Sequence, residues 1–286
     1  MSILTVNAGS SSIRLALHAC DAGAADTLAR HHGSAEPGAE GEVLEAFLDT
    51  HAEVDIACVA HRVVHGGDMA PGPHLIDRRL AALIEFHAPL APLHNPAALR
   101  WIRACRDRLG ARPQFAVFDT AFFHSLPKLA RRYALPTRVV EQHGLRRHGF
   151  HGLAHEAMWR HWQALRGRGR VISLQLGSGC SITATRDGSP MDTSMGFSPL
   201  EGLMMSTRSG DVDPGLLLHL LRSGVLDADA LQDLLSHRSG LLGVSGQSGD
   251  MRELLGSDSE SARLAIDLYT YRARKYLGAY LAVLGG

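Results

Sequence analysis

The sequence predicts an α/β protein. Short apolar runs of strand type alternate along the chain with amphipathic segments of helical period, as layered α/β domains require. A strand, turn and strand pattern from Ile3 to Leu17 returns at Val171 to Thr185, with Ser12 matching Ser181, which indicates an internal duplication. The length of 286 residues suits about two domains, each large enough to bury a core.

Composition excludes several classes of function. Lys plus Arg and Asp plus Glu number 29 each, so no overall charge attracts nucleic acid or an anionic membrane. The four cysteines lie far apart without a C-x-x-C motif, which argues against a zinc site or a disulfide framework and fits a reducing compartment. The first residues show no basic region followed by an apolar core, and no run approaches 18 apolar residues. We expect a soluble cytoplasmic protein without nucleic-acid or membrane partners.

The first strand pair is joined by the segment NAGSSS, residues 7–12. Small side chains and close backbone N–H groups at such a tip can cradle phosphate oxygens. Hairpins rich in Gly and Ser are also common without any ligand, so the residues alone leave both interpretations open.

Two further strands end in charged side chains. The strand predicted from Val54 to Val59 runs into Arg62, which is followed by Gly66 and Gly67, and a second strand from Phe115 to Phe118 ends at Asp119. Charged groups at the end of buried strands are well placed to line a binding site. We place the border between the halves just after Asp119, so that residues 1–121 form the first domain and residues 122–286 the second.

Helices are predicted between and after these strands. One runs from Arg78 to His87, and another begins at Asn95, which we expect to be its N-cap, with Pro96 at the first helical position. Gly33 to Glu42 is expected to be an exposed loop, and Ser259 to Leu284 a long amphipathic helix.

The stretch from Asp192 to Gly215 follows neither the helical nor the strand period and is interrupted by glycines and a proline. Long irregular segments inside compact domains are more often functional than not. Arg208 stands among small residues, so its planar fork is free to grip a phosphate or a carboxylate. The alternative is a structural turn in which Arg208 pairs with Asp211 or Asp213.

The histidines at 143, 148, 151 and 155 raise the alternative of a metallohydrolase. His151 and His155 have the i, i+4 spacing of zinc ligands on a helix, but no glutamate lies between them and no downstream acid has ligand spacing. A metal site therefore stays the weaker interpretation.

Eight motifs in order resemble the acetate kinase family, whose members phosphorylate short-chain carboxylates with ATP. They are VNAGSSSIR (6–14), HRVVHGG (61–67), APLHNP (91–96), VFDTAFF (117–123), YALP (133–136), HGFHGLAH (148–155), DTSMGFSPLEGLMMSTRSGDVDP (192–214) and SGLLGVSGQSGDMR (239–252). The resemblance implies a duplicated ribonuclease H-like fold of the actin, hexokinase and Hsp70 type, with two domains around a central cleft. It also implies ATP or ADP as substrate, Mg²⁺ or Mn²⁺ as cofactor, and a homodimer.

The resemblance assigns roles residue by residue. The catalytic set would be Arg62, Asp119, His151 and Arg208, and the acyl group would lie against Val64, Leu93, Phe150 and Pro199. The nucleotide and its phosphates would contact Asn7, Ser10, Ser12, Arg14, Gln175, Gly177, Ser178, Gly179, Asp250, Met251 and Arg252, and Asn7 would also support the metal.

The chain departs from the family pattern in three places. Arg14 stands where a lysine is usual, Gln175 and Ser178 stand where His and Asn are usual, and Leu153-Ala154 replaces Thr-Ser. Family members also continue past the helix that here ends near Leu284, and we expect the second domain to be incomplete. A catalytically impaired nucleotide-binding remnant is therefore the alternative to an active kinase.

Overall fold

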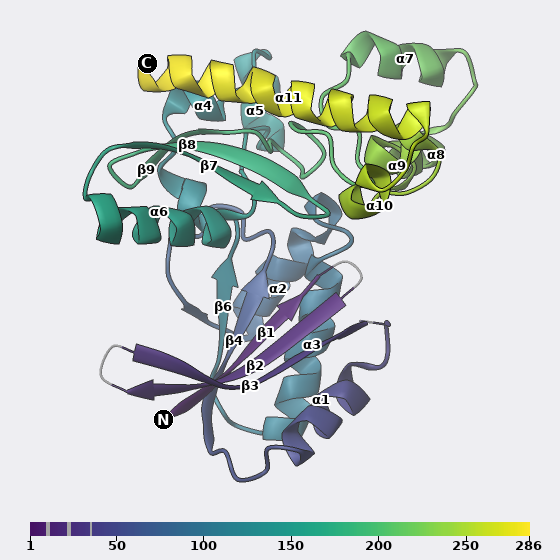
Figure 1. The fold of residues 1–286 in the computed structure, drawn as a ribbon. Coiled ribbons are helices and arrows are strands. Elements are labelled where there is room, and N and C mark those ends of the chain that lie inside the picture. The colour runs from purple at the N-terminus through teal and green to yellow at the C-terminus, as the bar shows by residue number, and fades with distance from the viewer. Residues whose placement is uncertain (10–11, 22–23, 35) are drawn as a thin grey trace. The chain divides into compact units, whose positions relative to one another are not determined.

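A computed structural model describes residues 1–9, 12–21, 24–34 and 36–286. The chain divides into two compact units, Met1–His124 and Ser125–Gly286 (Figure 1). The predicted border between residues 121 and 122 lies close to this division. Because each unit has its own sheet and its own packed helices, each is described by itself.

The first unit is built on a six-stranded sheet with the strand order β3-β2-β1-β4-β6-β5. Strands β1, β4 and β6 run parallel, whereas β2, β3 and β5 pair antiparallel with their neighbours. The strands are β1 Ser2–Ala8, β2 Ser12–Asp21, β3 Ala24–Ser34, β4 Ile56–Val63, β5 His74–Leu75 and β6 Gln114–Phe118. The helices are α1 Glu40–Asp49, α2 Arg78–Phe86, α3 Asn95–Leu109 and the short 3₁₀ segments η1 Ala88–Leu90 and η2 Ala121–Ser125.

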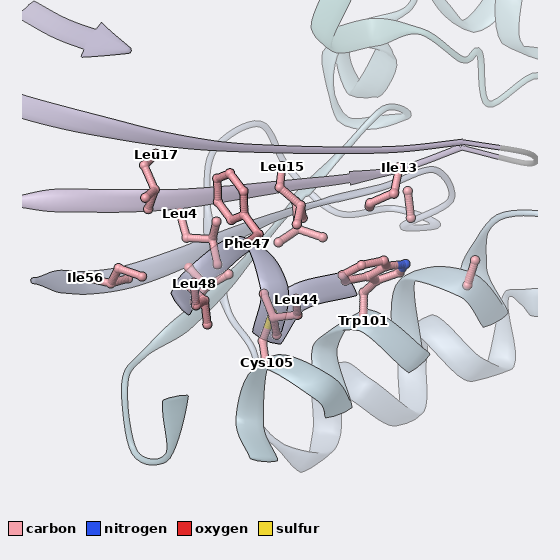
Figure 2. Packing of buried hydrophobic residues seen from close by; sticks show 14 residues of the cluster. Leu4, Ile13, Leu15, Leu17, Leu44, Phe47, Leu48, Ile56, Trp101 and Cys105 are labelled. Atoms are coloured by element: carbon pink, nitrogen blue, oxygen red, sulfur yellow. The ribbon is translucent and has the colours of Figure 1, made fainter. Parts of the chain in front are cut away.

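The core of this unit follows from the alternation of its strands. Alternate residues from Leu4 to Ala8 in β1 and from Ile13 to Leu17 in β2 are buried on one face of the sheet, because successive side chains of a strand point to opposite sides. Figure 2 shows these side chains packed against α1 and α3, with Phe47 and Trp101 as the largest contributors from the helices. The labelled cluster consists of Leu4, Ile13, Leu15, Leu17, Leu44, Phe47, Leu48, Ile56, Trp101 and Cys105.

The predicted helix is confirmed as α3, but its predicted cap is wrong. The N-cap residue is His94, and the Asn95 side chain is fully buried. Its Oδ1 accepts the N–H of His65 at 3.1 Å, and its Nδ2 donates to the carbonyls of His65 and Ile84, both at 3.0 Å. The side-chain amide of Asn95 therefore links α3 to the segment after β4. It cannot cap the helix as well, because its oxygen and nitrogen already bond to distant backbone groups.

Strand β3 was not predicted. Its described side chains are exposed or partly buried, and it pairs with β2 at the edge of the sheet. Its polar sequence lacks the alternation that marks a half-buried strand, since backbone pairing rather than burial holds it in place. The expected loop from Gly33 to Glu42 is correspondingly shorter, because β3 continues to Ser34 and α1 begins at Glu40.

The second unit has a three-stranded antiparallel sheet in the order β7-β8-β9. Figure 1 shows α6 and α11 on opposite faces of this sheet. The strands are β7 Arg170–Leu176, β8 Cys180–Arg186 and β9 Ser189–Thr193. The helices are α4 Lys128–Arg131, α5 Thr137–His143, α6 Gly152–Arg166, α7 Pro214–Arg222, α8 Ala228–His237, α9 Gly240–Ser245, α10 Met251–Leu255 and α11 Glu260–Leu284.

Helix boundaries in the second unit agree with the capping signals of the sequence. The carboxylates of Asp213 and Asp227 accept backbone N–H groups at the first turns of α7 and α8, and the Ser259 hydroxyl does so for α11. Between β9 and α7 the chain is irregular, as predicted for the stretch from Asp192. Across the described ranges, no helix combines the length and the apolar character needed to cross a membrane.

Candidate active site

Three polar side chains meet at the carboxyl ends of the parallel strands in the first unit. Asn7 lies near the end of β1, Arg62 near the end of β4, and Asp119 directly after β6. Strand β4 pairs with both β1 and β6, and Asp119 continues the ladder by donating its N–H to the carbonyl of Val63 at 3.0 Å. Residues that are far apart in sequence therefore lie at one edge of the sheet.

Arg62 is the centre of this group. Its Nε donates to Asp119 Oδ2 at 3.0 Å, its Nη2 donates to the same oxygen, and its Nη1 donates to Asn7 Oδ1 at 2.9 Å. The Asp119 side chain is only 2% exposed, whereas that of Arg62 is 23% exposed. Burial alone would lower the pKa of Arg62, but the attraction and hydrogen bonds of Asp119 outweigh it and raise the pKa.

The three contacts leave part of the guanidinium available. A guanidinium has five N–H donors, and Arg62 uses one from each of its nitrogens in the hydrogen bonds described. One donor on each terminal nitrogen stays available to an anion such as a carboxylate or a phosphate. The ion pair with Asp119 holds the side chain in one orientation before any ligand arrives.

A second group forms in the other unit around Gly179, at the tip between β7 and β8. A Cβ atom at this glycine would lie 3.3 Å from His151 Cε1 and 3.5 Å from Arg208 Nη1. A glycine at this position leaves room for the imidazole and the guanidinium beside the same backbone segment. The structure thus brings together three of the residues predicted for this half of the chain.

Arg208 has no acidic partner among the residues that the structure describes. Its Nη1 donates to the carbonyl of Pro199 at 3.3 Å and lies 3.9 Å from Met205 Sδ. Burial lowers the pKa of Arg208. A half-buried guanidinium that is not neutralised by the protein is a strong site for an anion.

The alternative pairing of Arg208 with the two aspartates of its loop is wrong. The Asp211 carboxylate accepts the N–H of Gly202 at 2.7 Å and the hydroxyl of Tyr276 at 2.6 Å. The Asp213 carboxylate caps α7. Both acids hold the loop and its neighbours, and neither binds the arginine.

His151 is held from both its backbone and its ring. It precedes α6 in a left-handed conformation with φ 60°, which is rare for a residue with a side chain. Its Nδ1 shares a hydrogen bond of 2.9 Å with Ser181 Oγ, which also bonds His155 Nε2 at 2.8 Å, and His155 Nδ1 bonds Ser173 Oγ at 2.7 Å. Because a hydroxyl carries one proton, at least one of the two imidazoles donates an N–H to Ser181.

His155 and Ser181 are therefore supporting residues that the sequence analysis did not assign. Both are fully buried. The i, i+4 spacing of the histidines was visible in the sequence, but the serine between them comes from β8 and only the fold places it there. Within the described ranges, no group of three or more His, Cys, Asp or Glu side chains could hold a metal ion.

The oxygens near Arg62 suit Mg²⁺ only in part. Asn7 Oδ1 and Asp119 Oδ2 already accept from the arginine, which leaves Asp119 Oδ1 as the unshared carboxylate oxygen of this group. Mg²⁺ in phosphate sites keeps several waters and relies on substrate oxygens and one or two carboxylates. These residues fit a metal ion held through water and phosphate, not one enclosed by protein ligands.

The remaining predicted residues are distributed over both units. Val64, 5% exposed, and Leu93, 37% exposed, belong to the first unit, while the buried Phe150 and the partly buried Pro199 belong to the second. Their role in one acyl pocket stays a prediction.

The phosphate-contacting residues predicted in the first unit lie on its first hairpin. Arg14 is exposed on β2 opposite Asn7, and the Ser12 carbonyl accepts the N–H of Gly9 at 2.7 Å. Ser10 lies outside the described residues.

The nucleotide residues predicted in the second unit lie at two turns. Gln175, Gly177 and Ser178 are at the β7–β8 tip, where the Ser178 carbonyl accepts the N–H of Ser206 at 3.0 Å. Asp250 caps α10 and binds Arg252, with Met251 between them, and the hydrogen bonds from Arg252 lower the pKa of Asp250 to about 2.

Comparison with known proteins gives consistent likenesses. A model of the acetokinase family matches residues 41–286. The chain is 48% identical over 238 residues to an acetate kinase of Streptomyces coelicolor, covering 81% of this chain and 58% of that protein. It is 40% identical over 311 residues to an acetate kinase of Micrococcus luteus, covering 100% of this chain and 79% of that protein. The chain thus spans little more than half of the first of these relatives.

Solved structures agree with the sequence comparisons. The crystal structure of an acetate kinase from Porphyromonas gingivalis matches with a TM-score of 0.85 at 36% identity, covering 100% of this chain and 80% of that one. A propionate kinase from Francisella tularensis matches with a TM-score of 0.89 at 33% identity, covering 99% and 81%. The predicted α/β fold, of the actin, hexokinase and Hsp70 type, is confirmed.

Proposed function

Because this chain belongs to the acetokinase family, we propose that it transfers the terminal phosphoryl group of ATP to acetate or propionate, reversibly, giving an acyl phosphate and ADP. The observation that carries the proposal is the half-buried guanidinium of Arg208, which lies beside His151 and Gly179 and has no acidic partner in the described part of the chain. Relatives named for acetate and for propionate support both acids as substrates.

Phosphoryl transfer suits such a site. The transition state spreads negative charge over three equatorial oxygens, so that fixed donors and a metal ion provide most of the catalysis. We assign Arg62 and Arg208 to the carboxylate and the migrating phosphoryl group, and His151 to a hydrogen bond with the latter. A carboxylate nucleophile is ionised at pH 7, so no general base is required.

The other groups complete the assignment. Asp119 fixes Arg62, and its remaining oxygen would help to hold Mg²⁺ through a water. The ion would supply positive charge to neutralise the phosphate oxygens. Asn7 supports Arg62 and the metal side of the site. The acyl group would lie against Val64, Leu93, Phe150 and Pro199, and the nucleotide against the hairpin tips and the turn at Asp250.

The larger organisation is part of the same proposal. The two units would act as domains of residues 1–121 and 122–286, in a cytoplasmic homodimer. The substrates would be small molecules, a carboxylate and a nucleotide, without nucleic-acid or membrane partners. The formal net charge of zero supports small anionic substrates, because positive charge is concentrated at single arginines and not spread over a surface that would attract a polyanion.

The test is an acyl hydroxamate assay with ATP and Mg²⁺ across formate, acetate, propionate and butyrate, with Arg208→Ala as the inactive control. We expect turnover with acetate or propionate that disappears in the variant. Titration calorimetry with Mg-ADP is run in parallel. Binding of the nucleotide without turnover by any acid would overturn the proposal and identify the chain as a nucleotide-binding remnant.

A further inference from the structure

The second unit contains a cluster of three side chains that sequence analysis did not assign. Tyr133 lies between α4 and α5, Arg147 between α5 and α6, and Glu201 in the irregular loop after β9. The Tyr133 hydroxyl donates to Glu201 Oε2, and Arg147 Nη2 donates to Glu201 Oε1 at 2.5 Å. Arg147 also lies over the Tyr133 ring, 5.7 Å from its centroid. We call these three residues the clamp.

The clamp holds the beginning of the loop. Arg147 Nη1 donates to the carbonyls of Thr193 and Ser194 at 3.0 and 3.2 Å, and the N–H of Phe197 donates to the Tyr133 hydroxyl at 2.8 Å. The Arg147 side chain is 16% exposed and that of Glu201 is 30% exposed, so these charge-assisted bonds are largely shielded from water. The loop segment between Thr193 and Glu201 is therefore fixed at both ends.

Gly196 passes directly over the clamp and connects it to the histidine. A Cβ atom at this position would overlap the Glu201 carboxylate and the Tyr133 hydroxyl. The Gly196 carbonyl accepts the N–H groups of His148 and Gly149 at 2.9 and 3.3 Å, just before His151. One side of the clamp thus reaches the backbone that sets the position of the imidazole.

The other side of the clamp reaches the arginine. Two residues before Glu201, the carbonyl of Pro199 accepts from Arg208 Nη1 at 3.3 Å. The next residue, Gly202, exchanges hydrogen bonds with Asp211, which encloses the segment carrying Arg208. Movement of Glu201 would therefore change the geometry of Arg208 as well as that of His151.

We propose that Tyr133, Arg147 and Glu201 are positioning residues that set the spacing between His151 and Arg208. The clamp binds neither substrate, and its function is to keep two elements of the site in one arrangement. The expected effect of the clamp on kcat rests on the phosphoryl transfer proposed above. Its expected effect on the order of the loop does not. Loss of a single clamp bond loosens the loop without removing a charge from the site.

The first experiment replaces Tyr133 with Phe, which removes only the hydroxyl that joins Phe197 to Glu201. Displacement of reacting groups by about 1 Å lowers turnover by up to about a hundredfold. We expect kcat to fall about tenfold to a hundredfold, with the KM values for acetate and ATP nearly unchanged. Tyr271→Phe is the matched control, because Tyr271 on α11 is 55% exposed. A rise in KM with constant kcat would overturn the positioning role.

A double-mutant cycle tests whether the clamp acts as one unit. Glu201→Gln keeps the shape of the side chain but removes the nearer of the two carboxylate charges that face Arg147, the other being that of Asp192 at 4.0 Å. If the three residues act together, Tyr133→Phe lowers kcat little further in the Glu201→Gln background, because contacting residues are not additive. If the fall in kcat of the double mutant equals the product of the two single-mutant falls, the residues act independently and the inference is contradicted.

Amide hydrogen exchange gives a measurement that does not depend on activity. Both variants should exchange faster in the peptides covering residues 146–152 and 193–202, while Tyr271→Phe matches the wild-type protein. If the wild-type protein forms no hydroxamate, the proposed function fails and exchange alone decides the clamp. Faster exchange confined to residues 193–202 would show that the clamp does not hold the histidine segment, and would overturn the inference.

Discussion

The two arginines proposed for catalysis, one in each unit, lie in opposite electrostatic surroundings. Arg62 in the first unit is bound by Asp119 and Asn7, and the attraction of the carboxylate raises its pKa against the effect of burial. Arg208 in the second unit contacts a backbone carbonyl and a thioether, and burial lowers its pKa. One cation is neutralised by the protein before a ligand binds, and the other is not.

This difference indicates that one arginine chiefly orients an anionic ligand and the other chiefly attracts it. A paired guanidinium is held still and adds little net charge, so Arg62 serves chiefly to present donors in a fixed direction. An unpaired guanidinium contributes its full charge to an arriving anion, and the protein bears the cost of its partial burial. Arg62 therefore serves orientation and Arg208 attraction in the proposed function, which gives each replacement a distinct expected result.

The largest effect is expected for Arg62→Ala, which removes the only ion-pair partner recorded for Asp119 in the described part of the chain. A buried carboxylate left without its partner costs roughly 3 to 5 kcal/mol of unfolding free energy. Turnover should fall by roughly 10³ to 10⁵, as for other arginines that stabilise phosphoryl transfer. Urea unfolding and the hydroxamate assay measure the two effects.

The double replacement Arg62→Ala with Asp119→Ala is the control for the ion pair. It should recover part of the stability and none of the activity. An Arg62→Ala protein as stable as the wild type would show that the two arginines do not differ in the way described.

Arg208→Ala should lower turnover by the same roughly 10³ to 10⁵ but leave the unfolding free energy unchanged or raised. Removing a half-buried cation relieves a desolvation cost and leaves no acid unpaired. Thermal melting and initial rates on the same sample measure both quantities. Arg222→Ala, at the exposed end of α7, is the matched control for loss of a positive charge. A strongly destabilised Arg208→Ala protein would contradict the comparison.

Gly179→Ala tests the arrangement of the second unit without altering any charge. The added methyl group would lie 3.3 Å from His151 and 3.5 Å from Arg208, so one of these side chains must shift by a few tenths of an ångström. We expect about a tenfold loss of kcat, less than the loss for a full 1 Å displacement. Gly278→Ala on α11, which meets nothing within 4 Å, controls for the substitution itself. Unchanged turnover would mean that the close approach at Gly179 has no role.

The last effect appears only at acid pH and concerns His61, the neighbour of Arg62 on β4. Its ring is 1% exposed and its Nε2 bonds Gln114 at 2.8 Å, and burial lowers its pKa to about 4. In the unfolded chain the imidazole has its usual pKa of about 6.5. The folded protein resists protonation of His61, so the unfolding free energy present above pH 6.5 is progressively lost as the pH falls toward 4.

The unfolding free energy is expected to fall by roughly 3 kcal/mol between about pH 6.5 and pH 4. Measurement of the His61 ring by NMR over pH should give a midpoint near 4. A midpoint near the ordinary value would show that the first unit does not shield its buried groups as the Arg62 pair suggests.

Much of the fold follows from local sequence. The alternation of Leu4 and Val6 in β1 and of Ile13, Leu15 and Leu17 in β2 predicts strands with one buried face, and both pack as expected. Helices α7, α8 and α11 begin where an aspartate or serine can accept the free N–H groups of the first turn. These features depend on neighbours within a few residues, which is why they can be predicted.

Other features depend on distant parts of the chain. Strand β3 has no apolar period of its own and exists because β2 offers it a partner. Asn95 has the sequence context of a cap, yet its amide binds His65 and Ile84 across the core. Local patterns fail in both cases because the decisive hydrogen bond comes from another element.

The sequence alone indicated which side chains are candidates for the chemistry. It placed Arg62 and Asp119 at the ends of strands and Arg208 in an irregular loop, and its motifs indicated the family. Which arginine is neutralised depends on the fold, since Asp119 lies 57 residues from Arg62 and reaches it through the pairing of β4 with β6. Asp211, three residues from Arg208, binds Gly202 and Tyr276 instead. Proximity in sequence does not decide an ion pair, because strand order and loop path fix which charged groups can meet.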